Sequence, residues 1–343
     1  MNQTQTQTQS QSQSQSQSQS QTQQTPSPLP DSASHEPAPP APPEPPVPCA
    51  RYLVVHQTRY TYQSAVSLSQ QYLHMTPRSF DHQRTESHQI VTEPPAEDGS
   101  DGPDYFGNLT RHFSITAPHN MLLVHVESTL ALYPRPTLDG IAGTQPWEQV
   151  RDLMQRDRSD ATLEACQYLY ASPHVGLRPE LADYARDSFS AGRPLLDAAL
   201  DLTQRIFDDF EFDNDATDIS TPLEEVLRGR RGVCQDFAQL MIGAMRSLGL
   251  PARYMSGYIL THPPEGQPRM IGADASHAWV SVYDPALGWV DFDPTNSCLV
   301  QNEHIVTGWG RDFSDVTPMR GIVLGGGEQS LQVNVTVTPL DLG

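Results

Sequence analysis

The stretch that decides the fold is residues 231–237, Arg-Gly-Val-Cys-Gln-Asp-Phe, because a helical pattern opens there. Apolar residues then recur at helical spacing, namely Phe237, Leu240, Met241, Ala244, Met245 and Leu248. The pattern closes with Gly-Leu-Pro at 249–251, which is typical of a helix end. Cys234 is therefore predicted in the first helical turn, where free amides and the helix dipole favour a thiolate and can receive an oxyanion.

A second, shorter helix is predicted just before this one. Residues 220–224, Ser-Thr-Pro-Leu-Glu, offer a capping side chain, a proline suited to the first turn and a capping-box glutamate. The helix should end near residues 228–229. The acidic stretch before it resembles a calcium loop in spacing, but its sixth position is Asp218 where the sharp turn needs glycine. We interpret it as an extended, solvated entry to the helices.

Two strands downstream carry a histidine and a carboxylate. Residues 277–283 alternate in polarity, and residues 289–293 follow a short Pro-Ala-Leu-Gly turn at 285–288, so a hairpin is predicted. Antiparallel pairing brings the outer ends of a hairpin together, which places His277 beside Asp293. A cysteine, a histidine and an aspartate in this relation can act as nucleophile, base and orienter.

These motifs resemble the transglutaminase-like superfamily, and specifically the bacterial transglutaminase-like cysteine proteases. The matching stretches are Gly-Val-Cys-Gln-Asp-Phe-Ala at 232–238, residues 246–258, His-Ala-Trp at 277–279 and Asp-Pro-Thr at 293–295. The family's N-terminal region is matched by His56-x-Thr58-x-Tyr60-x-Tyr62, Thr-Pro-Arg at 76–78 and Tyr-Phe-Gly-Asn at 105–108. The resemblance implies an α+β fold, with a papain-like core whose helix-borne cysteine packs on an antiparallel sheet.

The resemblance also implies that Cys234, His277 and Asp293 form a catalytic triad that cleaves or transfers amide acyl groups through a thioester. The protein is thus expected to be an enzyme, with hydrolysis favoured over crosslinking. Taken alone, each of these residues is more often structural than catalytic, so the prediction depends on the three contexts occurring together. Papain-like proteases place a glutamine six positions before the cysteine, and that position is Arg228 here. A non-catalytic binding protein on the same scaffold is the alternative.

Spacing also bears on the remaining cysteines and on metal binding. Cys49, Cys166 and Cys298 lie in unrelated contexts and are interpreted as structural or incidental thiols. No Cys-x-x-Cys or His-Glu-x-x-His pair is present, so we expect neither a metal site nor any cofactor. Four cysteines without paired spacing agree with a reducing compartment. A cytoplasmic location is expected, because the sequence shows no secretory signal and no apolar run of membrane-spanning length.

Composition divides the chain of 343 residues into four segments. Residues 1–48 form a Gln/Ser/Thr- and Pro-rich tail, which is predicted to be disordered. Residues 49–137 are predicted as a β-rich N-terminal module, 138–325 as the catalytic core and 326–343 as a C-terminal strand. The sequence does not indicate which module that strand joins.

A formal net charge of −20 argues against binding to nucleic acids or to anionic membranes. The expected partners are a protein or peptide substrate as amide donor and, for acyl transfer, an amine acceptor. Arg228, Arg230 and Arg231 could steer an acidic substrate, but pairing with nearby acidic residues is the more ordinary role. The sequence does not predict the oligomeric state.

We expect deletion of residues 1–48 to leave the thermal midpoint and the turnover of a small amide unchanged. The reason is that this segment is too polar and proline-rich to pack against a core. Limited proteolysis followed by mass measurement should show a cut that stops near Arg51. Unfolding or loss of turnover on deletion would show that the tail belongs to the folded unit.

Overall fold

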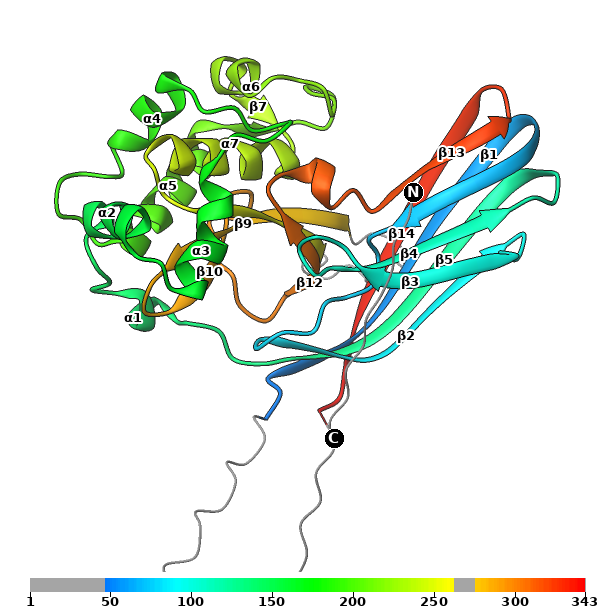
Figure 1. Cartoon of the computed structure of the whole chain (residues 1–343), viewed down its shortest axis with the longest axis horizontal. Helices are drawn as coiled ribbons and strands as arrows, with labels where there is room; N and C mark the ends of the chain where they lie inside the picture. Colours follow the sequence, from blue (N-terminus) through cyan, green and yellow to red (C-terminus); the bar gives the residue numbers. More distant parts are fainter. Residues whose placement is uncertain (1–46, 262–274, 343) are drawn as a thin grey trace, which may run out of the picture. The chain divides into compact units, whose positions relative to one another are not determined.

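The computed structural model describes residues 47–261 and 275–342 (Figure 1), so most of the predicted tail lies outside the described part. The described strands are β1 Ala50–Leu73, β2 Gln83–Glu93, β3 Asp98–Pro103, β4 Leu109–Ile115, β5 His119–Leu132, β6 Glu211–Phe212, β7 Arg231–Gly232, β8 Ala252–Ile259, β9 Ala275–Asp284, β10 Gly288–Asp293, β11 Cys298–Leu299, β12 His304–Gly310, β13 Met319–Gly325 and β14 Gln329–Leu340. The α-helices are α1 Leu138–Ile141, α2 Trp147–Arg156, α3 Asp160–Cys166, α4 Pro179–Arg186, α5 Leu195–Asp209, α6 Leu223–Gly229 and α7 Cys234–Ser247. The 3₁₀ helices are η1 Gln167–Leu169 and η2 Phe313–Asp315. The predicted α+β class is confirmed.

The first sheet is built around β1, whose 24 residues alternate between buried and more exposed side chains along their first half. The strand order is β2-β5-β1-β4-β3, and both β13 and β14 also pair with β1. The long strands of this sheet are visible together in blue, cyan and red in Figure 1. The C-terminal strand, which the sequence left unassigned, therefore joins the N-terminal module, in register from Arg51↔Leu340 to Tyr62↔Gln329.

The second sheet is antiparallel, with the order β11-β10-β9-β8-β12. Helix α7 packs on β9 and β8 and is buried along almost its entire length. Its apolar residues share one core with α4, α5 and the inner faces of β9 and β10. The predicted hairpin is β9 and β10, with Phe292 opposite Val280 and Trp289 opposite Tyr283. This is the helix-on-sheet core that the family resemblance implied.

Strand β12 lies at the edge of the second sheet, and amide side chains of the N-terminal module satisfy its outer backbone groups. Gln83 donates from Nε2 to the Val306 carbonyl at 2.7 Å, and its Oε1 accepts from the Val306 amide at 2.8 Å. Asn108 makes the same pair of bonds with Trp309, at 2.8 and 3.0 Å. Each amide thus substitutes for a neighbouring strand, which removes an unpaired edge.

Turn-forming side chains set two helix boundaries, and the second differs from the predicted cap. Residues 147–166 are divided into two helices, because α2 ends at Arg156 and α3 begins at Asp160, where Ser159 caps the new helix by accepting from the Thr162 amide. The short helix α6 has Pro222 at its N-cap and no side-chain cap, because the Thr221 hydroxyl accepts from the Asp218 amide instead. Turn-forming polar side chains took the hydrogen bonds in both places.

The four-segment division stays a prediction, and the sheets cross one of its boundaries. Strand β13 lies before the predicted boundary at residue 325, yet it pairs with β1 of the first sheet. The described residues from 47 onward belong to one compact unit. Within the described part of the chain, no helix combines the length and apolar character needed to cross a membrane.

Candidate catalytic site

Cys234 is the first residue of α7, and the turn before it is fixed by Asp236. The Asp236 carboxylate accepts from the Val233 amide at 2.9 Å and from the Thr217 hydroxyl at 2.6 Å. Gly232 allows this close approach, since a Cβ there would lie 2.7 Å from the same carboxylate oxygen. Cys234 itself is half-buried. The thiol therefore sits at the amide-rich end of a rigid, long helix, with some access from outside.

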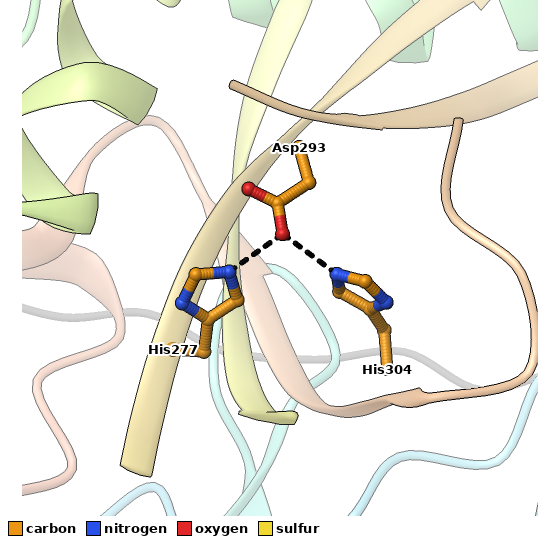
Figure 2. Close-up of side chains that lie close together, drawn as sticks. All are labelled: His277, Asp293 and His304. Carbon is orange, nitrogen blue, oxygen red and sulfur yellow. Dashed lines mark hydrogen bonds and ion pairs between the residues drawn. The ribbon is translucent and has the colours of Figure 1, made fainter. Parts of the chain in front are cut away.

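His277 and Asp293 come together across the hairpin as their positions predicted. Figure 2 shows His277 Nε2 facing Asp293 Oδ2, and the two atoms are 2.7 Å apart. The other ring nitrogen, Nδ1, points away from the carboxylate. The Cys234 side chain also interacts with the His277 side chain and helps to raise the pKa of His277. All three predicted residues thus form one connected chain from helix to hairpin.

The electrostatics favour a charged histidine. Burial acts to lower the pKa of His277, but its hydrogen bonds and charge interactions with Asp293 and Cys234 outweigh this and raise the pKa to about 10. Burial likewise acts to raise the pKa of Asp293, whereas hydrogen bonds from His277 and His304 hold it well below its usual range. An imidazolium beside an ionised carboxylate follows from both shifts at neutral pH. Such a pair can deliver a proton to a leaving group.

Asp293 accepts hydrogen bonds from several groups besides His277. Oδ1 accepts from the backbone amides of Thr295 and Asn296, at 2.9 and 3.2 Å. Oδ2 accepts from Asn296 Nδ2 at 2.6 Å and from His304 Nε2 at 2.8 Å, in addition to His277. Neither Asn296 nor His304 was predicted from the sequence. Asn296 was recognisable as an amide three residues after the aspartate. No local sequence pattern indicated His304, which lies on β12.

Asp291, two residues earlier on β10, occupies a different environment. Its carboxylate forms a buried ion pair with Arg135 at 2.7 Å and accepts from Trp279 Nε1 at 3.2 Å. Burial acts to raise the pKa of Asp291, but the charges of Arg135 and Arg253 keep it below the usual value. Asp291 therefore neutralises buried arginines and does not contact His277 in the described interactions.

The other cysteines and the basic residues before Cys234 lie outside the triad. Burial first, and then the charge of Asp293, raise the pKa of Cys298 to about 12, and burial raises that of Cys166. Arg230 stacks over the rings of Tyr184 and Phe210, and Arg231 lies 3.5 Å from Asp213. These two arginines are engaged within the fold.

One group of side chains could be considered for a metal ion, namely His277, Asp293 and His304. Both ring nitrogens lie 2.7–2.8 Å from the same carboxylate oxygen. Two ligands of a tetrahedral zinc ion, each about 2.0–2.1 Å from the metal, would be about 3.3 Å apart. The shorter separations are those of charge-assisted hydrogen bonds, so this arrangement fits a proton network better than a metal centre.

Comparison with known proteins shows the family of this chain. Residues 182–294 match the family model of the transglutaminase-like superfamily, and residues 52–131 match the bacterial transglutaminase-like N-terminal region. The uncharacterized protein Rv2569c of Mycobacterium tuberculosis is 40% identical over 304 residues, covering 85% of this chain and 93% of that protein. The chain belongs to the transglutaminase-like superfamily. The resemblance stated from the motifs is confirmed.

Further relatives differ in how much of this chain they cover and in their sequence identity to it. The uncharacterized protein ML0607 of Mycobacterium leprae is 31% identical over 296 residues, covering 84% of this chain and 99% of that protein. The crystal structure of a "putative cysteine protease" from Cytophaga hutchinsonii covers 85% of this chain and 91% of that chain, with a TM-score of 0.67 and 19% identity, and thus shows a shared fold. A protein-glutamine gamma-glutamyltransferase of Pseudomonas aeruginosa is 36% identical over 67 residues, covering 19% of this chain and 10% of that protein.

Proposed function

We propose that the protein is a cysteine enzyme that cleaves or transfers amide acyl groups through Cys234, His277 and Asp293. The observation that carries the proposal is that one histidine is hydrogen-bonded to a buried carboxylate and interacts with a cysteine at a helix N-terminus. A nucleophile, its base and the base's orienter need this order of contacts. Membership of the transglutaminase-like superfamily supports the same chemistry.

In the proposed reaction the Cys234 thiolate attacks the carbonyl carbon of an amide and forms the carbon–sulfur bond. The electron pair of the carbonyl moves to its oxygen, which backbone amides at the start of α7 can stabilise. When the tetrahedral intermediate collapses, the carbon–nitrogen bond breaks and the His277 Nδ1 proton passes to the leaving nitrogen. A thioester on Cys234 remains, and Asp293 keeps the imidazole in place throughout.

The thioester is resolved by water or by an amine. His277 takes the proton of the incoming nucleophile, the new bond forms at the acyl carbon, and the Cys234 thiolate leaves. We propose hydrolysis as the main outcome, with a protein or peptide as amide donor, and a cytoplasmic location for the enzyme. Incubation of a glutamine-containing peptide with a primary amine would reveal crosslinking by a mass increase equal to the amine minus ammonia.

A binding protein on the same scaffold is the competing function. It would bind peptides without trapping them, whereas an enzyme with this triad should form a covalent bond. The test is intact-mass measurement after incubation with a peptide that carries a chloromethyl ketone. We expect one adduct on Cys234 in the wild type and none in Cys234→Ala. Absence of an adduct in the wild type would favour the binding protein.

Cys234 should also react faster with iodoacetamide at pH 7 than any of the other three cysteines, by about tenfold or more, because thiolates react and thiols do not. The raised pKa values of Cys166 and Cys298 keep those thiols protonated. The Cys49 thiol donates to the Leu132 carbonyl and is half-buried. Peptide mapping over a time course gives the four rates. Slower labelling of Cys234 in His277→Ala is the matched control, and labelling of Cys49 first with Cys234 inert would contradict the proposal.

A further inference from the structure

A second histidine is bonded to the proposed catalytic carboxylate. Asp293 Oδ2 lies 2.7 Å from His277 Nε2 and 2.8 Å from His304 Nε2, and Figure 2 shows the two rings on either side of this oxygen. The two histidines come from separate strands, β9 and β12. His304 is only 3% exposed, so its bond to Asp293 is shielded from water. The proposed reaction as described above gives His304 no role.

The bond to Asp293 defines the protonation of His304. An ionised carboxylate only accepts hydrogen bonds, so His304 Nε2 must carry a hydrogen. Burial lowers the pKa of His304, although the Asp293 carboxylate opposes this shift, and the charges of His277 and Arg135 lower it further. The ring is therefore neutral, and its Nδ1 atom is buried without a hydrogen-bond partner among the described residues. A buried ring that leaves one nitrogen unpaired in order to donate from the other is unusual and calls for a reason.

We propose that His304 is a positioning residue that keeps the Asp293 carboxylate ionised and aimed at His277 during turnover. The proposal rests on the proposed function. When His277 passes its Nδ1 proton to the leaving nitrogen, its charge disappears and Asp293 loses its cationic partner. The neutral His304 N–H does not change in this step and continues to compensate the carboxylate charge. His304 transfers no proton, so it acts on the reaction only through Asp293.

Two substitutions of His304 can separate the effect of its N–H donor from the effect of its ring packing. The His304 ring packs edge-on against Trp279 with the centroids 5.2 Å apart. His304→Phe keeps an aromatic ring there and removes the N–H, whereas His304→Gln keeps an N–H and removes the ring. His56 is a matched control, because it is also buried and bonded through both nitrogens, to Tyr258 and Thr58, away from the triad.

The experiment follows hydrolysis of a peptide p-nitroanilide by the full-length protein, because this amide has a leaving nitrogen that His277 must protonate. We expect His304→Phe to lower kcat by about tenfold, the rate equivalent of one hydrogen bond to a charged group, with KM within about twofold. His304→Gln should restore most of kcat. His56→Phe should leave kcat near the wild-type value, whatever it does to the thermal midpoint. A kcat of His304→Phe equal to the wild type would overturn the proposal.

A double-mutant cycle tests whether His304 acts through Asp293. Once Asp293→Ala has removed the carboxylate, adding His304→Phe should lower kcat no further. Independent, multiplicative losses in the double variant would show a merely structural role and overturn the inference. Cys234→Ala separates this failure from that of the proposed function. If Cys234→Ala hydrolyses the anilide as fast as the wild type, the thiol is not the nucleophile, and both proposals are wrong.

Discussion

Cys234→Ala and His277→Ala are each expected to remove nearly all turnover, by about 10⁵-fold or more, while the fold stays intact. In the proposed reaction the thiol forms the covalent intermediate, and the imidazole is hydrogen-bonded to Asp293 and interacts with Cys234, so neither should be replaceable by a neighbour. Asp293→Asn should cost less, about 10³–10⁴-fold, because oxyanion stabilisation and substrate binding survive. Rates should be measured on p-nitrophenyl acetate and on a peptide amide, together with the thermal midpoint of each variant.

Asp291→Asn is the matched control for Asp293→Asn. Both aspartates are buried on β10, but Asp291 pairs with Arg135 and does not contact His277 in the described interactions. Its substitution leaves Arg135 without a full countercharge, so the main effect should be on stability. The activity of the folded protein should fall much less than in Asp293→Asn. Full activity in His277→Ala would refute the triad outright, and equal losses in both asparagine variants would refute the choice of Asp293.

The sequence could predict the hairpin because its parts are local. Alternation from His277, a four-residue turn and a return strand to Asp293 lie within 17 residues, and short-range pairing follows from the turn. The glycine at 288 confirms the turn chemistry, with φ of 73°. The helix from Cys234 was readable for the same reason. In contrast, the contact between Cys234 and His277 depends on packing of α7 against β9, which only the family resemblance suggested.

The parts that the sequence analysis missed are those made by distant segments. His304 reaches Asp293 because β12 pairs with β8, on the far side of β9, and no local pattern records that neighbour relation. The same holds for Gln83 and Asn108, which complete the edge of β12 from the N-terminal module. Polar side chains with long-range partners carry no periodic signal, so their roles appear only when the sheet order is known.

Gly257→Ala is expected to destabilise the protein by about 3 kcal/mol or more, or to prevent folding. Gly257 lies in β8 between two paired strands, opposite His277 on β9 and Val306 on β12. A Cβ at this position would lie 1.8 Å from the Ile305 carbonyl oxygen and 2.9 Å from the Trp279 ring. The oxygen belongs to the backbone, so the clash can be relieved only by moving β12 away from β8.

Moving β12 would also displace His304, the first residue of that strand, from Asp293. Urea unfolding should therefore show a lower midpoint for Gly257→Ala, and any folded fraction should turn over more slowly per molecule. Gly102→Ala is the matched control, since Gly102 also lies in a strand, but a Cβ added to it would meet no atom of another segment within 4 Å. Its midpoint should stay near the wild-type value, because the new methyl group meets open space. A wild-type midpoint for Gly257→Ala would mean that β12 does not pack this tightly on β8. The close approach of these two strands would then not explain how His304 is aligned with Asp293.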